Sequence, residues 1–325
     1  MKVVVTGGAG FIGSNLTDEL ARDHEVTVID NLSTGRIENL DHIRDRIEFI
    51  NGSILDLDLL RRAFAGADIV FHQAAISSVQ RSVDNPIASN QANVDGTLNV
   101  LVAAKDSRVR KVVFASSSSV YGDTPTLPKR EDMKPNPKSP YAITKVAGEY
   151  YCRVFSEVYG LKTVCLRYFN VFGPRQDPKS EYAAVIPRFV TRILQGKPPV
   201  IYGDGQQTRD FTFVKDVVKA NILAGMGDAE GVFNIACGRR ISLNELAGLI
   251  MEIVGRQVEP EYDMPRAGDI RDSLADISAA GEALGYQRML FLNQDIPRRS
   301  FIARISACTS RNWAAYPGWI SSLIQ

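Results

Sequence analysis

A glycine-rich turn separates the first strand-like run of the chain from the first helix-like run, and it restricts the fold more than any other segment. The sequence VVVTGGAGFIGSNL places Gly7, Gly10 and Gly13 directly after three valines. The first glycine permits a tight turn, the second lets backbone approach a pyrophosphate, and the third lets the helix pack closely on the strand. The helix N-terminus then offers unpaired N–H groups to the phosphates. This segment therefore predicts a dinucleotide-binding βαβ unit.

A carboxylate closes the second predicted strand. The run Glu25–Asp30 ends in Asp30, at the position where an acid accepts hydrogen bonds from a ribose 2′-hydroxyl and repels a 2′-phosphate. Three glycines alone could be a simple turn, but a strand before them, a helix after them and this acid make the pattern specific. We expect NAD rather than NADP.

Short apolar runs alternate with longer amphipathic ones through the first two-thirds of the chain. This alternation predicts a Rossmann-like α/β fold, with right-handed crossovers and a doubly wound parallel sheet. The Pro- and Gly-rich stretches after residue 170 predict loops that cover a site. We expect an NAD-binding domain at 1–169, with a returning segment near 208–236, and a smaller α/β substrate-binding domain at 170–325. The predicted strands are Lys2–Thr6, Glu25–Asp30, Ile47–Asn51, Ile69–His72, Lys111–Ser116 and Thr163–Tyr168, and the predicted helices are 12–22, 56–65, 90–106 and 141–159.

The composition is that of an ordinary soluble globular protein, with 45% hydrophobic and 23% charged residues and a net charge of +1. Such a balance gives no electrostatic reason to expect nucleic acid or an acidic membrane as partner. Four scattered cysteines and three histidines give no metal-ligand spacing and favour a reduced compartment. The N-terminus has too short an apolar run for a signal peptide, and no stretch is apolar enough to span a bilayer. We expect a cytoplasmic protein without a metal.

A tyrosine and a lysine stand four positions apart in SPYAITKVAGE, at what reads as the start of a helix. Pro140 suits a first helical turn, and Tyr141 and Lys145 then lie on one helix face. The pair could be a surface contact. Alternatively, the ammonium group lowers the pKa of the phenol, so that the phenol can exchange protons near neutrality.

Taken together, these motifs resemble the extended short-chain dehydrogenase/reductases, and within them the NAD-dependent epimerase/dehydratase family. Three motifs in the second half are most similar to those of UDP-hexose 4-epimerases, and the similarity ends near Tyr286. The motifs are DNL at 30–32, FHQAA at 71–75, ASSSSVYGD at 115–123, LRYFNVFGPRQ at 166–176, TRDFTFVKDV at 208–217 and RAGDIRDSLAD at 266–276.

The resemblance implies an isomerase that oxidises carbon 4 of a UDP-sugar transiently and returns the hydride to the other face. Tyr141 would take the proton of the 4-hydroxyl, Lys145 would bond the nicotinamide ribose and favour the phenolate, and Ser117 would relay the proton. It also implies a homodimer.

The resemblance further implies two sets of contact residues. The cofactor contacts are Gly7, Gly10, Phe11, Ile12, Gly13, Asp30, Asn31, Ser53, Ile54, Gln73, Ala74, Ala75, Asn93, Tyr141, Lys145 and Tyr168. The substrate contacts are Ser117, Asn170, Ala184, Val185, Arg188, Val200, Tyr202, Arg209, Arg266, Asp269 and Ser273. Val200 and Tyr202 would hold uracil, the two arginines Arg209 and Arg266 would hold the diphosphate, and Asp269 would bind a ribose diol.

The chain departs from the family after the third strand, where Gly52-Ser53-Ile54 replaces the usual Gly-Asp-Ile. Ser53 can accept a hydrogen bond from adenine, although more weakly than a carboxylate. Asp56 is then expected to cap the helix that follows.

The size of one residue predicts the sugar. The fourth residue after the aspartate of Arg-x-Gly-Asp guards the sugar pocket in the family, and here it is Ser273. A serine leaves room for a 2-acetamido group, so we expect UDP-N-acetylglucosamine and UDP-N-acetylgalactosamine, and also UDP-glucose and UDP-galactose. Ser273 could instead be a small residue at a strand start, with the choice of sugar made elsewhere.

Three alternatives stay open. A 4,6-dehydratase would need an Asp-Glu pair where this chain has Ser118 and Ser119, which cannot supply that acid–base chemistry. A UDP-glucuronate 4-epimerase would need an additional cationic or amide group for its carboxylate. An NAD-sensing regulatory protein would be expected to lose Tyr141 or Lys145, and both are present.

The segment 288–325 differs from the rest of the chain. It contains five arginines, no lysine, no glutamate and both tryptophans. It is either a specialised end or a sequence altered by a change of reading frame, and no function is taken from it.

Overall fold

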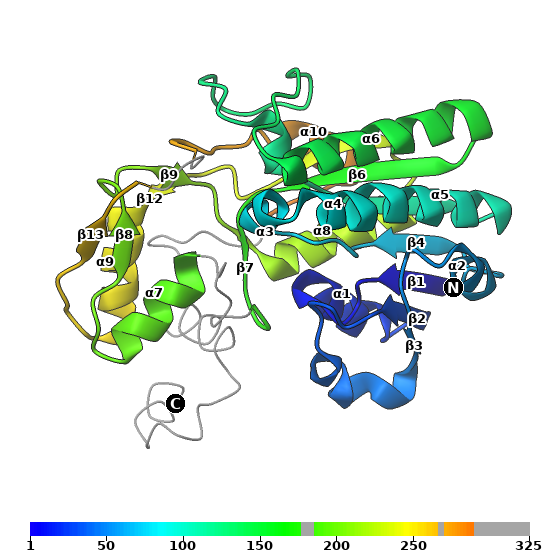
Figure 1. The fold of residues 1–325 in the computed structure, drawn as a ribbon, viewed down its shortest axis with the longest axis horizontal. Helices are drawn as coiled ribbons and strands as arrows, with labels where there is room; N and C mark the ends of the chain where they lie inside the picture. Colours follow the sequence, from blue (N-terminus) through cyan, green and yellow to red (C-terminus); the bar gives the residue numbers. More distant parts are fainter. Residues whose placement is uncertain (177–184, 266–269, 289–325) are drawn as a thin grey trace.

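The computed structural model describes residues 1–176, 185–265 and 270–288, and a seven-stranded parallel sheet forms its centre (Figure 1). The order across the sheet is β11-β6-β5-β4-β1-β2-β3. The chain therefore adds β2 and β3 on one side of β1, then crosses back and adds the later strands on the other side, beginning with β4. The strands are β1 (Lys2–Thr6), β2 (Glu25–Asp30), β3 (Ile47–Asn51), β4 (Ile69–His72), β5 (Lys111–Ser117), β6 (Lys162–Tyr168) and β11 (Gly231–Ile235). Ligands of such sheets bind at the carboxyl ends of the strands beside this reversal.

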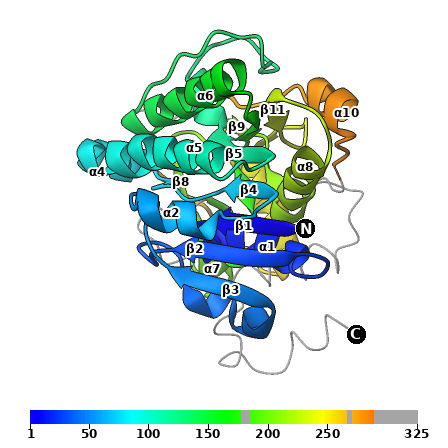
Figure 2. The same cartoon turned by 90° about the vertical axis from the view of Figure 1, so that its right-hand side faces the viewer.

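Helices cover both faces of the sheet, and each face has its own apolar core. One face packs against α1 (Phe11–Leu20), α8 (Val214–Met226) and α10 (Ser278–Leu284). The other face packs against α2 (Leu57–Ala63), α5 (Gly96–Asp106) and α6 (Pro140–Tyr159). Figure 2 shows α5 and α6 on one side of the strands and α8 and α10 on the other. Burial on both faces explains the continuous valine and isoleucine runs of the strands.

The six predicted strands lie where the sequence places them, to within one residue at β5 and β6. The predicted helix over 90–106 is confirmed over its second part, and only its first turns differ in form. The chain there makes α4 (Pro86–Asn90), a single π-helical turn (η3, Gln91–Asp95) and then α5. Such turns are frequent at functional sites, and this one contains Asn93.

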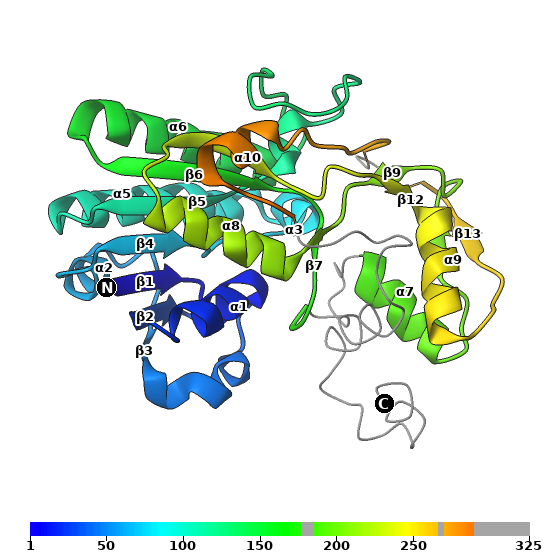
Figure 3. The ribbon, with the colours of Figure 1, turned by 180° about the vertical axis from the view of Figure 1, so that it is seen from behind.

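A smaller region stands beside the carboxyl edge of the sheet (Figure 3). The Pro- and Gly-rich stretches that predicted loops contain regular elements here: α7 (Val185–Leu194), β8 (Val200–Tyr202), β9 (Thr208–Arg209) and β10 (Thr212–Phe213). The other elements of this region are β7 (Val171–Phe172), β12 (Ile241–Ser242), α9 (Leu243–Val254) and β13 (Glu261–Asp263). The short helix α3 (Val79–Asp84) follows β4 and packs against α4 and α6 in the larger half.

The elements of the smaller region form because they share a third apolar core. Phe189 and Ile193 of α7 are buried against Leu246 and Ile250 of α9. The Ser242 hydroxyl accepts from the Glu245 N–H, and the Glu245 carboxylate accepts from the Ser242 N–H, which closes the first turn of α9. The fold therefore places a second, separately packed unit over the carboxyl ends of the strands.

Candidate active site

The turn between β1 and α1 forms a cradle that only glycines can build. Gly7 has φ +71°, and a side chain there would lie 2.6 Å from the backbone of Ala74. A side chain at Gly13 would meet the Gly7 carbonyl oxygen, so the helix packs directly on the turn. Gly10 is the N-cap of α1, and because it has no side chain it leaves the N–H groups of the first helical turn uncovered. This helix N-terminus fits the pyrophosphate of a dinucleotide.

Asp30 lies beside this cradle at the end of β2. One carboxylate oxygen accepts from the Ala9 N–H at 3.0 Å and the other accepts from the Leu32 N–H at 2.8 Å. Burial raises the pKa of Asp30, and these two backbone hydrogen bonds oppose the shift. Both oxygens are fixed in place by backbone and retain lone pairs for a ribose diol. The neighbouring Asn31 is exposed and caps its own turn through Ser33 N–H.

The residues after β3 pack in two different ways. Ile54 is buried, whereas the hydroxyl of Ser53 accepts from the Leu55 N–H at 3.2 Å and can still turn toward a base. Asp56 caps α2 by accepting from the Leu59 N–H at 2.9 Å, which confirms its predicted structural role.

The segment after β4 is held by side chains from three other elements. Asn93 accepts from the Ile76 N–H at 2.8 Å and donates to the Ile76 carbonyl, which fixes the chain just beyond Ala74 and Ala75. The Gln73 amide bonds Asn221 of α8 and accepts from the Tyr168 hydroxyl. This arrangement gathers the predicted cofactor residues of β4, η3 and β6 at one edge.

Tyr141, Lys145 and Ser117 meet where β5 ends against the first turns of α6. Lys145 donates from Nζ to the Ala115 carbonyl at 2.8 Å, and that nitrogen lies 5.7 Å from the centre of the Tyr141 ring. Pro140 is the first residue of the helix, as the sequence predicts, and Ser139 caps the helix by accepting from the Ala142 N–H. Ser117 ends β5 and hydrogen-bonds the Tyr141 hydroxyl.

The pKa values in this cluster are set by burial first. Burial raises the pKa of Tyr141 to about 12, opposed by the hydrogen bond from Ser117. Burial lowers the pKa of Lys145 to about 8, opposed by the charge of Glu149. The prediction that the lysine lowers the phenol's pKa therefore does not describe the dominant effect, because desolvation outweighs a cation several ångströms away. Positive charge beside the ring favours the phenolate, and the charge of Lys145 alone does not overcome the effect of burial.

The predicted substrate residues form two groups in the smaller region. Asn170 has φ +33° and donates to the Asp210 carbonyl at 3.1 Å and to the Ser273 hydroxyl at 3.5 Å. On the other side, the Arg188 guanidinium lies over the Tyr202 ring, 5.4 Å from its centre, and bonds its hydroxyl. Val185 begins α7 and Val200 begins β8, and both are half-buried beside this second group. The predicted contacts Ala184, Arg266 and Asp269 lie outside the described residues.

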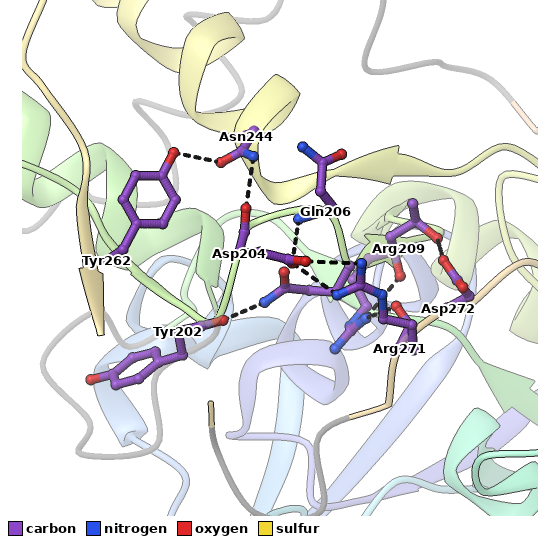
Figure 4. A network of polar contacts seen from close by, with 10 residues as sticks. Tyr202, Asp204, Gln206, Arg209, Asn244, Tyr262, Arg271 and Asp272 are labelled. Atoms are coloured by element: carbon purple, nitrogen blue, oxygen red, sulfur yellow. Dashed lines mark hydrogen bonds and ion pairs between the residues drawn. The ribbon is translucent and has the colours of Figure 1, made fainter. Parts of the chain in front are cut away.

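A network of polar contacts links the segment that carries Tyr202 to the segment that carries Ser273 (Figure 4). Arg209 donates to the carbonyls of Thr208 and Arg271, at 2.8 Å and 3.3 Å. Arg271 makes a two-pronged ion pair with Asp204, at 2.8 Å and 3.1 Å. Asp272 accepts from the Thr208 hydroxyl. The segment that carries Ser273 is therefore fixed against β9, and the Arg209 guanidinium lies in that junction.

Several residues of this site escape sequence reasoning. Asn221 and Thr144 hold Gln73 and Asn93 in place, but they come from α8 and α6 and no local pattern marks them. Glu149 has a signal, because it continues the i, i+4 spacing of Tyr141 and Lys145 by one more turn. Among the described residues, no group of His, Cys, Asp and Glu could hold a metal ion, and no helix is long and apolar enough to cross a membrane.

The site combines a glycine cradle, an acid after β2 and a Tyr–Lys pair at the end of β5. Comparison with known proteins identifies the family to which the chain belongs. Residues 3–236 match the model of the NAD dependent epimerase/dehydratase family. The chain belongs to this family. The family that the sequence motifs indicated is thereby confirmed. Together with the relatives and solved structures described next, the match also confirms the Rossmann-like fold class, NAD as cofactor and the isomerase class.

Similar proteins from three organisms are named as 4-epimerases. The chain is 45% identical to the UDP-glucose 4-epimerase of Mycolicibacterium smegmatis over 306 residues, 92% of this chain and 97% of that one. The UDP-N-acetylglucosamine 4-epimerase of Methanobrevibacter ruminantium, solved with UDP-N-acetylmuramic acid, is 44% identical with a TM-score of 0.90, over 95% of this chain and 98% of that one. The UDP-glucuronic acid 4-epimerase of Bacillus cereus, solved with UDP-glucuronic acid and NAD, is 31% identical with a TM-score of 0.86, over 95% and 99%.

The position of Asp30 generates a test of the cofactor preference. We expect the protein to bind NAD in preference to NADP, and Asp30→Ala to weaken NAD binding by about tenfold or more, because hydrogen bonds to a charged group contribute about 1.5–3 kcal/mol each. Titration calorimetry with each nucleotide measures the ratio. Asp41→Ala, which removes an exposed carboxylate from the next segment, should leave the ratio unchanged. Preferential binding of NADP by the wild type would contradict this assignment.

Proposed function

We propose that this protein is an NAD-dependent UDP-sugar 4-epimerase that interconverts UDP-N-acetylglucosamine and UDP-N-acetylgalactosamine, and also accepts UDP-glucose and UDP-galactose. The observation that carries the proposal is the cluster of Tyr141, Lys145 and Ser117 at the carboxyl end of β5, on the same sheet edge as the dinucleotide cradle. An acid–base group at this edge can act on a sugar hydroxyl while the cofactor acts on the carbon that carries it.

Tyr141 is the proposed base for the sugar's 4-hydroxyl. When bound, NAD accepts a hydride from carbon 4 and later returns it. Tyr141 takes the hydroxyl proton during the first half and gives it back during the second, and the hydrogen bond from Ser117 favours the phenolate form. Because burial raises the pKa of Tyr141 to about 12, the phenolate needs nearby positive charge.

Lys145 is the proposed source of part of that charge and a holder of the cofactor. Its ammonium group is buried and fixed by the Ala115 carbonyl, which leaves two N–H donors for a ribose. Since a fixed charge needs no reorganisation during the reaction, it favours the phenolate throughout the cycle.

The proposed acetamido substrate follows from the small side chain of Ser273. Its N–H donates to the Thr208 carbonyl at 3.1 Å, so the backbone at this position is held from β9. The side chain is 9% exposed and lies beside Asn170, a predicted substrate residue. A serine occupies far less volume than the tyrosine expected in an enzyme restricted to plain hexoses, and the 2-acetamido group can use that volume.

A UDP-glucuronate 4-epimerase is the second candidate, supported by the likeness to the Bacillus cereus enzyme. A sugar carboxylate needs a cation or amide cluster to replace its water. A 4,6-dehydratase is less well supported, because Ser118 and Ser119 offer hydroxyls where that reaction needs a carboxyl pair.

The direct test is incubation of the purified protein with each UDP-sugar, followed by chromatographic separation of the 4-epimers. We expect UDP-N-acetylglucosamine to give its 4-epimer without added oxidant. Tyr141→Phe should keep NAD binding and lower kcat by about 10²–10⁴-fold, because the proton acceptor is removed and the ring remains. Activity of Tyr141→Phe within about twofold of the wild type would exclude Tyr141 as the base.

Ser273→Tyr tests the sugar pocket. We expect this variant to lose turnover of UDP-N-acetylglucosamine and to retain UDP-glucose 4-epimerisation, because the phenol fills the volume of the acetamide. The ratio of kcat/KM values for the two sugars is the measurement. Ser273→Ala is the control and should keep both activities. If the wild type does not act on UDP-N-acetylglucosamine, the pocket argument is wrong.

We also propose that two copies of the chain associate through the outer face of α6. Ile143, Tyr150, Val154 and Val158 lie on one side of this helix and are 41–65% exposed. Ile87 of the neighbouring α4 is 72% exposed. An apolar stripe along a 20-residue helix is costly to leave in water, and a two-fold axis lets the stripe cover its own copy.

Val154→Glu tests this association. We expect the wild type to be a dimer and Val154→Glu to shift it toward the monomer, because a carboxylate would be buried at the centre of the stripe. Light scattering coupled to size-exclusion chromatography gives the mass. Arg62→Glu places the same acid at an exposed position of α2, away from the stripe, and should leave the dimer intact. A monomeric wild type at micromolar concentration would refute the proposal.

A further inference from the structure

Three side chains of α6 contact three consecutive residues of β5. Tyr141 bonds the hydroxyl of Ser117, and Lys145 donates to the carbonyl of Ala115. One turn further on, the Glu149 carboxylate accepts from the Ser116 hydroxyl at 2.5 Å. The spacing i, i+4, i+8 places all three on one face of the helix. Tyr141 and Lys145 take part in the proposed reaction, whereas Glu149 has no assigned role in it.

Glu149 is held more firmly than either of the other two. Arg167 of β6 donates to it from Nε at 2.8 Å and from Nη2 at 2.7 Å, in the paired geometry that guanidinium and carboxylate prefer. Their side chains are 8% and 4% exposed. Ser116 and Arg167 are register partners on adjacent parallel strands, so the carboxylate is anchored to both strands at once.

The remaining donor capacity of Arg167 is also used. Its Nη1 donates to the Tyr121 hydroxyl at 2.7 Å, and that hydroxyl donates to Asn234 of β11 at 2.7 Å. Asn234 in turn donates to the Lys129 and Asp276 carbonyls. The network therefore extends from α6 through β6 to β11.

Such a pair is expensive to bury. Removing two charges from water costs several kcal/mol each, and a well-packed apolar pair is often at least as stable. Stability alone gives no reason for charges at this place. A reason appears in the neighbourhood of Lys145, because Glu149 lies one turn away on the same helix face and its negative charge favours the charged form of the lysine.

We propose that Glu149, anchored by Arg167 and Ser116, is a positioning residue that keeps Lys145 charged and α6 in register with the end of β5. The inference rests on the proposed function, in which the Lys145 ammonium favours the Tyr141 phenolate. Glu149 acts through Lys145 and does not itself contact a reacting atom.

The other groups around Lys145 are His72, Phe114, Tyr141 and the buried thiols Cys152 and Cys165, and the effect of Glu149 on the pKa of Lys145 is larger than that of either thiol. On β4, His72 is neutral, because burial and the Lys145 charge lower its pKa to about 3. On β6, Cys165 stays a thiol, since contact with Cys152 and burial raise its pKa. On β5, Phe114 contributes only its ring face, 4.9 Å from Nζ. Tyr141, on α6 itself, is neutral unless it acts as the base.

The sign of the effect follows from these causes. Burial lowers the pKa of Lys145 to about 8, and Glu149 opposes that shift. Without the carboxylate, the pKa of Lys145 falls further, so the ammonium is lost at a lower pH. The alkaline limb of the kcat profile should then move to lower pH. A defect of packing alone would lower kcat by the same factor at every pH.

The test is the pH profile of kcat for Glu149→Gln with UDP-N-acetylglucosamine, or with UDP-glucose if that is the sugar turned over. We expect the alkaline limb to move down by about one pH unit, so that kcat above both pKa values falls about tenfold while kcat near pH 6.5 changes little. Glu157→Gln, the same substitution at an exposed position of α6, should leave the profile unchanged. An unshifted limb in Glu149→Gln overturns the proposal.

A second variant separates charge from folding. Glu149→Gln leaves Arg167 buried without its partner and lowers stability. Ser116→Ala removes one hydrogen bond that anchors Glu149 and removes no charge. We expect it to lower the melting temperature and to leave the alkaline limb unshifted, whereas a limb that moves in Ser116→Ala as far as in Glu149→Gln would overturn the proposal.

A measurement that needs no turnover distinguishes this inference from the proposed function. The titration of Lys145 can be followed by NMR of the intact protein labelled with ¹³Cε-lysine, with its signal assigned by its loss in Lys145→Arg. We expect the midpoint to fall in Glu149→Gln. A wild type that epimerises no UDP-sugar refutes the proposed function, whereas an unchanged Lys145 midpoint refutes the role of Glu149.

Discussion

The whole molecule depends on burying one parallel sheet on both faces. Because α2, α5 and α6 cover one face and α1, α8 and α10 cover the other, polar side chains along the strands have almost no exposed surface to occupy. The carboxyl edge of the sheet is where the chain can place polar groups in contact with a ligand. The glycine cradle, Asp30, the segment after β4 and the Tyr141 cluster all lie on that edge.

Desolvation controls the chemistry of this edge. It raises the pKa of Tyr141 to about 12 and lowers the pKa of Lys145 to about 8, so that each group is pushed toward its neutral form. A base of this kind becomes useful only when fixed charges surround it. The charge beside Tyr141 is that of Lys145, and in the proposed role the Glu149 carboxylate, held by Arg167, keeps the lysine charged. The fold thus uses a costly ion pair beside the proposed proton acceptor, where it has an electrostatic task.

The smaller region shows how a second packed unit completes the edge. Its own core of α7 and α9 is separate from the sheet, and short strands and ion pairs attach the Ser273 segment to β9. Exposed ion pairs such as Asp204 with Arg271 contribute little to stability. Their value here lies in orientation, because they fix a segment that carries a predicted contact with the sugar.

The sequence by itself determined the order of the strands along the chain, the glycine cradle, the acid after β2 and the Tyr–Lys spacing. These features are local, since each follows from periodicity or from backbone conformations that only particular residues adopt. The tertiary structure alone decided the π-helical turn at Asn93, the elements within the Pro- and Gly-rich stretches and the direction of the Tyr141 pKa shift. It also decided the partners Asn221, Thr144 and Arg167. These features depend on which segments of the chain come into contact and on how much water that contact excludes. A short stretch of residues encodes neither of the two.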